Sequence, residues 1–175
     1  KNKITALCAI SLMFVIVFSA VGSTEATLLG GNGPEAVLLH FNFSYGGAHR
    51  YYGNVWQGAA NWSNTPTDVN IAPWPGVPYA VHIDVFDIYS NATWWGATTW
   101  IPCSSCTYSY TSYQLNQRTL DPENDFTRTK VATHEFGHTV GLAHAPSGTT
   151  SIMNQGHLSY NTPRQYDHND LNTLY

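Results

Sequence analysis

Hydrophobic and polar residues alternate most regularly over residues 79–89, YAVHIDVFDIY. Val81, Ile83 and Val85 fall on one face of an extended chain, and polar positions such as His82 fall on the other. Because side chains of a strand point alternately to its two faces, this pattern predicts a half-buried strand. Shorter runs of the same kind predict further strands at residues 35–43, 68–72, 97–102 and 110–120.

Three other segments have the period of a helix. Apolar residues recur at helical spacing over residues 48–64, although two glycines weaken the pattern. A second helix should begin at Asn124 or Asp125, because either side chain can cap its first turn. A third is expected from about Thr162 to Tyr175. Strands interspersed with a few helices and no internal repeat predict a single α+β domain, a sheet with helices packed on it.

The first 26 residues differ from the rest of the chain. Lys1 and Lys3 precede a long apolar run, and small residues follow it near Ala20 and Ala26. This layout is typical of a secretory signal peptide. A membrane anchor is the alternative, since the run is nearly long enough to span a bilayer, but no basic stop-transfer cluster follows it. We therefore expect a signal peptide over 1–26, a single folded domain over 27–175, a secreted product and no stable membrane association after signal removal.

Composition excludes two classes of protein. Aromatic residues make up 14% of the chain and charged residues only 10%, which is not the composition of a disordered chain. The net charge of −4 leaves no basic surface for nucleic acid. The polar but mostly uncharged remainder agrees with an extracellular domain.

The cysteines are few. Cys8 lies inside the expected signal peptide, so the mature chain would keep Cys103 and Cys106 as CSSC. In an exported protein this spacing favours a small disulfide-closed loop. A second metal site and free thiols are the alternatives.

Three histidines of HEFGHTVGLAH, residues 134–144, carry the clearest chemistry. His134 and His138 are four residues apart, so on a helix they lie ~40° apart in rotation and ~6 Å apart along the axis. Both can reach one metal ion. On a continued helix His144 would point ~120° away from His138. A shared ion therefore requires the chain to turn, and Gly141 can take the positive φ that ends a helix.

Glu135 follows His134 and is rotated by ~100° from it, so it would flank the metal rather than bind it. A carboxylate there suits a general base that takes a proton from a metal-activated water. Three neutral nitrogen ligands with one open position are typical of catalytic rather than structural zinc. The motif therefore predicts one catalytic Zn²⁺.

HExxHxxGxxH resembles the signature of the metzincin zinc peptidases. Met153, nine residues after the third histidine, is similar to the methionine of their Met-turn, although ordinary core packing also accounts for it. VATHEFGHTVGLAH looks most like the matrixin family, and the final YDHNDLNTLY resembles the helix that closes matrixin catalytic domains. The resemblance is specific over residues 126–154. It implies a metzincin-type zincin fold: a mixed twisted sheet with a packing helix, an active-site helix and a C-terminal helix.

The sequence also departs from the family. Gln155 stands where some metzincins carry a metal-binding tyrosine. His82 and Asp84 have the spacing of a structural zinc site, but the Gly/Asp-rich calcium loop that should follow is missing, so we interpret them as outward-facing strand residues. Structural Ca²⁺ or a second Zn²⁺ is thus not supported by a motif. With only Cys8 upstream, a propeptide cysteine switch is not expected either.

These observations predict a secreted zinc endopeptidase that acts on protein or peptide substrates. The resemblance implies a substrate bound as an added antiparallel strand, and Gly96, Ala97 and Thr98 are our candidates for the sheet edge that receives it. The alternative is a secreted zinc-containing binding or adhesion module without turnover, for which the Trp- and Tyr-rich segments would serve. The presence of Glu135 favours the enzyme.

Overall fold

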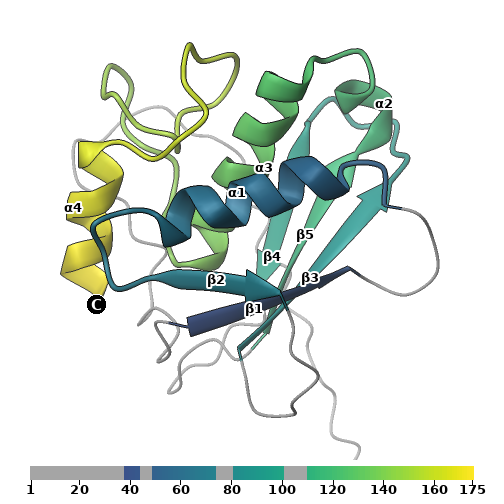
Figure 1. Ribbon diagram of the computed structural model, residues 1–175. Helices are drawn as coiled ribbons and strands as arrows, with labels where there is room; N and C mark the ends of the chain where they lie inside the picture. The colour runs from purple at the N-terminus through teal and green to yellow at the C-terminus, as the bar shows by residue number, and fades with distance from the viewer. Residues whose placement is uncertain (1–37, 44–48, 74–80, 101–109) are drawn as a thin grey trace, which may run out of the picture.

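The computed structural model describes residues 38–43, 49–73, 81–100 and 110–175 (Figure 1). The expected signal peptide and the Cys103–Cys106 pair lie outside these residues. The elements, in chain order, are β1 Leu38–Phe43, α1 Tyr52–Ser63, β2 Asn70–Pro73, β3 Val81–Ile88, β4 Gly96–Trp100, β5 Tyr110–Asn116, α2 Gln117–Leu120, α3 Asp125–Thr139 and α4 Gln165–Leu174.

The five strands form one mixed sheet in the order β2-β1-β3-β5-β4. β1 pairs in parallel with β2 and β3, and β3 pairs in parallel with β5. β4 is antiparallel to β5, with Thr98 opposite Tyr113, and is the last strand of the described sheet. The predicted α+β architecture with a mixed sheet is therefore confirmed, and β4 has one edge without a strand partner in the described part of the chain.

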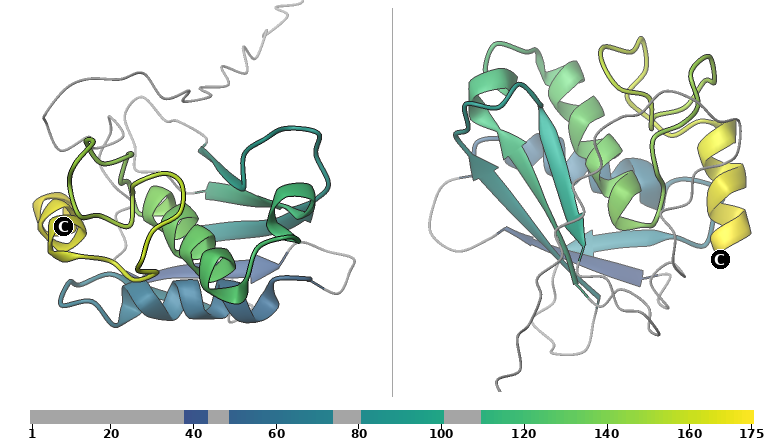
Figure 2. Two further views of the ribbon diagram at one scale, coloured as in Figure 1. Left: turned by 90° about the horizontal axis from the view of Figure 1, so that it is seen from above. Right: turned by 180° about the vertical axis from the view of Figure 1, so that it is seen from behind.

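Helices α1 and α3 cover the same face of this sheet, as the view from behind shows (Figure 2). Phe136 of α3 is fully buried between two rings of the sheet, with centroid distances of 5.6 Å to Phe41 and 5.0 Å to Tyr113. Gly58 brings the two helices together, because a Cβ atom there would lie 3.0 Å from the backbone of Ala132. This packing fixes α3 against β1 and β5, the two strands that flank the central strand β3.

The predicted helices differ from the observed ones mainly at their ends. α1 starts at Tyr52 and α4 at Gln165, each a few residues later than expected. The short helix α2 was not predicted; it arises where the Asn116 side chain accepts a hydrogen bond from the Arg118 amide and caps a single turn. α3 begins after the cap Asn124, as predicted, and ends at Thr139. Gly141 has φ of 96°, which confirms the expected turn.

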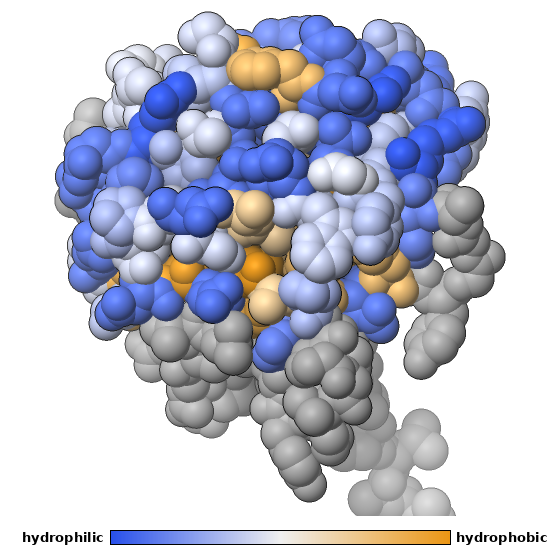
Figure 3. All heavy atoms as spheres, in the orientation of Figure 1, coloured by the Kyte–Doolittle hydropathy of each residue, from blue (hydrophilic) through white to orange (hydrophobic). Residues whose placement is uncertain are grey.

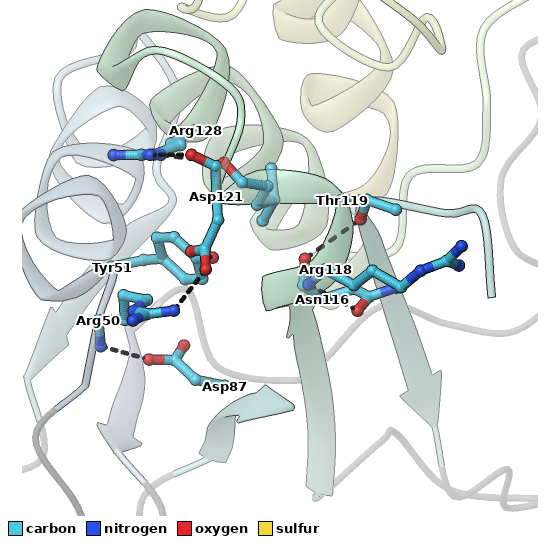
Figure 4. Close-up of polar contacts among 9 residues, drawn as sticks. Arg50, Tyr51, Asp87, Asn116, Arg118, Thr119, Asp121 and Arg128 are labelled. Carbon is cyan, nitrogen blue, oxygen red and sulfur yellow. Dashed lines mark hydrogen bonds and ion pairs between the residues drawn. The ribbon is translucent and has the colours of Figure 1, made fainter. Parts of the chain in front are cut away.

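A polar network joins the start of α1 to the rest of the domain (Figure 4). The Arg50 amide donates to Asp87 at 2.6 Å, and the Arg50 side chain pairs with Asp121. Asp121 also accepts from the Tyr51 hydroxyl at 2.6 Å, and its carbonyl accepts from Arg128 at 2.7 Å. The network thus ties α1, the end of β3 and the turn before α3 together.

Hydrophilic residues cover most of the face seen in Figure 3, with small apolar areas between them. Among the residues described, none of the helices combines the length and apolar character that a membrane crossing requires.

Candidate metal centre and active site

The three histidines of the motif meet at the C-terminal end of α3. One nitrogen from each of His134, His138 and His144 lies within 4.8 Å of the others. The Nε2 atoms of His138 and His144 are 3.3 Å apart. His144 reaches this position because the chain leaves the helix at Thr139 and turns at Gly141. The structure thus brings together the three side chains that the sequence analysis assigned to one ion.

Two backbone carbonyls orient two of the three imidazole rings. His134 Nδ1 lies 2.9 Å from the Ile152 carbonyl, and His138 Nδ1 lies 2.7 Å from the Leu142 carbonyl. A carbonyl only accepts, so each Nδ1 carries the proton and each Nε2 keeps its lone pair for a ligand. Such outer contacts hold the tautomer and direction of a metal-binding imidazole.

Burial keeps the histidines neutral. It lowers the pKa of His134 well below the usual value and that of His138 to about 3, with the neighbouring histidines contributing in the same direction. The pKa of the less buried His144 is also lowered, again mainly by burial. Metal ligation requires the neutral ring, so the site is prepared for a cation at neutral pH.

The donor set fits zinc. Tetrahedral Zn²⁺ with Zn–N bonds of ~2.1 Å places its nitrogen ligands ~3.4 Å apart, close to the observed 3.3 Å between His138 and His144. Three imidazoles leave the fourth position for water or substrate, as in catalytic zinc sites. His134, His138 and His144 would therefore hold the ion.

Glu135 lies between the three histidines and the edge of the sheet. Its side chain is buried and accepts a hydrogen bond of 2.6 Å from the Thr98 hydroxyl of β4. Gly96 leaves the room for it, because a Cβ atom there would lie 2.5 Å from Glu135 Oε1. Burial raises the pKa of Glu135 to about 7, while the Thr98 hydrogen bond and Lys130 act in the opposite direction. A carboxyl with this pKa can both take up and release a proton near neutral pH.

Met153 is buried and packs against Gly137 of α3. A Cβ atom on Gly137 would lie 2.3 Å from the Met153 sulfur, so the glycine of α3 is what allows this contact. The preceding turn is held by Asp167 of α4, which accepts from the Ile152 amide at 2.9 Å and from the Ser151 hydroxyl. This role of Asp167 could not be predicted from the sequence, because its position three residues after the cap Arg164 signals helix capping only.

Lys130 is a second residue that the sequence analysis missed. It lies one helical turn before His134, is almost completely buried, and donates from Nζ to the Asn154 carbonyl at 2.8 Å. Burial lowers the pKa of Lys130 to about 8. Its spacing of four residues from His134 is a signal that could have placed it on the same helical face.

The remaining predicted residues have these positions. Gly96, Ala97 and Thr98 lie on β4, the end strand of the sheet, beside Glu135. His82 and Asp84 lie on the central strand β3. Among the described residues, the one group of histidine, cysteine or carboxylate side chains close enough to share a metal ion is His134, His138 and His144. The predicted disulfide of Cys103 and Cys106 lies outside the described chain.

A mixed five-stranded sheet, an active-site helix with two histidines, and a third histidine on the turn that follows define the class of metzincin-like catalytic domains. The chain belongs to the matrixin family, whose model matches residues 31–175. No curated protein matches the chain. Among solved structures it is similar to a chain described as the GM1-bound form of the ECX AB5 holotoxin, with 12% identity, a TM-score of 0.54, and 78% of this chain and 79% of that chain covered. At this identity the likeness concerns the fold alone.

Proposed function

We propose that this protein is a secreted zinc-dependent endopeptidase that hydrolyses peptide bonds. The observation that carries the proposal is the position of Glu135, a buried carboxylate held by Thr98 next to three convergent neutral histidines. A site built only to bind zinc needs no such carboxylate. Membership of the matrixin family supports the same reaction class.

The residues divide the chemistry between them. When bound, zinc would lower the pKa of the attacking water and polarise the peptide carbonyl. Glu135 accepts the proton of that water and then delivers it to the leaving amine. Thr98 fixes the direction of the Glu135 carboxylate, since its hydroxyl donates to Oε2 at 2.6 Å.

The substrate in this proposal is an extended segment of a protein or peptide. It pairs as an added antiparallel strand with the edge of β4, where Gly96, Ala97 and Thr98 lie beside Glu135. Secretion rests on the first 26 residues, which would be removed to leave the domain 27–175.

Expression of the full chain in a secreting host tests both parts. We expect protein in the medium with a new N-terminus near residue 27, about one zinc per chain, and cleavage of casein or a peptide library that a chelator abolishes. Glu135→Ala should keep zinc and lose cleavage.

A binding or adhesion module with bound zinc is the second candidate. It is favoured by two aromatic side chains of α1, Tyr52 and Trp56, which are 52% and 37% exposed. Zinc at full occupancy with no cleavage of any library member would support this candidate and exclude the peptidase.

A further inference from the structure

The loop between β3 and β4 contains an asparagine in the pattern N-x-[ST], as Asn91-Ala92-Thr93. This pattern is the acceptor sequence for N-linked glycosylation when its middle residue is not proline. The chain contains the pattern at two other positions, Asn42 and Asn61. Because the pattern is the same at all three, only the fold can distinguish the asparagines.

Asn91 has the surroundings that a glycan requires. Its side chain and that of Thr93 are exposed. The backbone of the loop is held in place, since Arg118 donates to the Asn91 carbonyl at 2.6 Å and Asn116 donates to the Ala92 carbonyl at 3.1 Å. Figure 4 shows Asn116 and Arg118 side by side at the start of α2. The Asn91 side-chain amide makes no hydrogen bond to the described part of the chain, so a fixed loop presents a free amide.

Asn61 has the opposite surroundings. Its Nδ2 atom lies between α1 and its neighbours and donates to the Thr133 hydroxyl at 3.0 Å and to the Asn161 carbonyl at 2.9 Å. An asparagine Nδ2 carries two protons, and both are used here. An N-glycosidic bond replaces one of them, and the attached sugar would need the space of Thr133 or Asn161. Trp62, the middle residue of this pattern, is fully buried. A glycan on Asn61 is therefore incompatible with this fold.

Asn42 is also less suited than Asn91. It is half-buried on β1, an inner strand of the sheet with β2 and β3 on its two sides. Ser44, the third residue of its pattern, lies outside the described residues. Asn91 is thus the one acceptor asparagine for which the structure provides both an exposed side chain and an ordered loop.

We infer that Asn91 is an N-glycosylation site, modified when the chain passes through a secretory pathway that glycosylates its cargo. The inference rests on the secretion in the proposed function and not on the peptidase activity. The co-substrate is an oligosaccharide carried on a polyisoprenyl diphosphate. Asn91 Nδ2 forms a bond to the anomeric carbon of the first sugar, the bond from that carbon to the diphosphate oxygen breaks, and one amide proton is released with the diphosphate.

The test expresses the full chain in a eukaryotic host that secretes and glycosylates. Peptide N-glycosidase removes each glycan and converts its asparagine to aspartate, so peptide mass spectrometry identifies every acceptor separately. We expect a glycan on Asn91 and unmodified Asn61. Asn91→Gln and Thr93→Ala should each lose the glycan of this loop, whereas Thr93→Ser, the matched control, keeps the hydroxyl of the acceptor pattern and should keep the glycan.

A second chain, in which a leader of the host replaces residues 1–26, separates the glycan from secretion. A glycan on Asn91 of this chain, with the full chain retained in the cell, would contradict secretion by the natural leader and support the site. Secreted protein with unmodified Asn91, or with a glycan on Asn61, overturns the inference. Secreted protein that is glycosylated on Asn91 and binds zinc but cuts no peptide would contradict the peptidase activity alone.

Discussion

The Thr98 hydroxyl donates a hydrogen bond of 2.6 Å to the Oε2 atom of Glu135. This contact joins the end strand of the sheet to the helix that carries two of the histidines. The strand proposed to hold the substrate therefore also holds the proposed base. The position of a peptide on β4 and the direction of the Glu135 carboxylate are consequently set by the same few residues.

Thr98→Val should lower kcat without loss of zinc. The change keeps the shape of the side chain and removes the donor to a buried carboxylate, which costs about 1.5–3 kcal/mol and predicts a decrease of about ten- to a hundredfold. Steady-state kinetics and zinc analysis of the purified variant measure this. Thr99→Val, at an exposed neighbouring position, is the control. An equal decrease of kcat in both variants would mean that valine in β4 lowers activity by disturbing the strand, and not by removing the hydrogen bond to Glu135.

Gly96→Ala should abolish most activity in a folded protein. The new Cβ would meet Glu135 Oε1 at 2.5 Å and Cγ at 2.7 Å, so the carboxylate must move. A displacement of about 1 Å costs about a hundredfold in rate. Gly53→Ala is the control, because nothing lies within 4 Å of its added Cβ. Wild-type activity in Gly96→Ala would show that Glu135 does not need its present position.

Asp167→Asn should loosen the turn around Met153. The carboxylate of Asp167 is buried and accepts from the Ile152 amide, the Ser151 hydroxyl and the Arg164 amide. Loss of its charge should lower the free energy of unfolding by about 2 kcal/mol. Zinc affinity should fall too, because the Ile152 carbonyl orients His134.

Urea unfolding and competition with a chromophoric chelator measure these two effects of Asp167→Asn. Asp170→Asn, on the same helix but only half-buried, should change stability by less than about 0.5 kcal/mol. A variant of Asp167 that unfolds like the parent protein and binds zinc equally well would contradict the role of the turn.

Asp87→Asn should gain stability relative to the parent protein as the pH rises. Burial raises the pKa of Asp87 in the folded state, against the lowering effects of the Arg50 amide and its other partners. In the unfolded chain the carboxyl of Asp87 loses its proton above about pH 3.9, whereas in the folded protein it keeps the proton to a higher pH. Between these two pKa values the folded state binds more protons, so the free energy of unfolding of the parent protein falls as the pH rises. Urea midpoints of both proteins from about pH 4 to 7 measure the difference. A constant difference would mean that Asp87 has the same pKa in both states.

The sequence predicted the fold well where the pattern of burial decides it. The sequence of β3 alternates between apolar and polar residues because Ile83 and Val85 face the core. α3 begins after Asn124, whose side chain caps the helix through a local hydrogen bond. The ends of α1 and α4 were less accurate, because neither helix has a side-chain cap of the usual Ser, Thr, Asp or Asn type. α2 is a single turn, too short to have a period.

The candidate site was predictable only where its residues are close in sequence. His134, Glu135, His138 and His144 share one motif, and their spacing relates to geometry through the helical repeat. Thr98 was expected at a substrate edge, but its hydrogen bond to Glu135 joins residues 37 apart. Asp167 and Lys130 act through contacts that depend on tertiary packing, which no local pattern encodes.

All three histidines of the candidate metal site lie within the eleven residues 134–144. A metal held by so short a stretch closes only a small loop, so it restricts the conformational entropy of the unfolded chain far less than a crosslink between distant segments would. The sheet and its two covering helices are complete without that crosslink. Zinc should therefore leave and return by local opening of the turn at Gly141, at a rate independent of global unfolding.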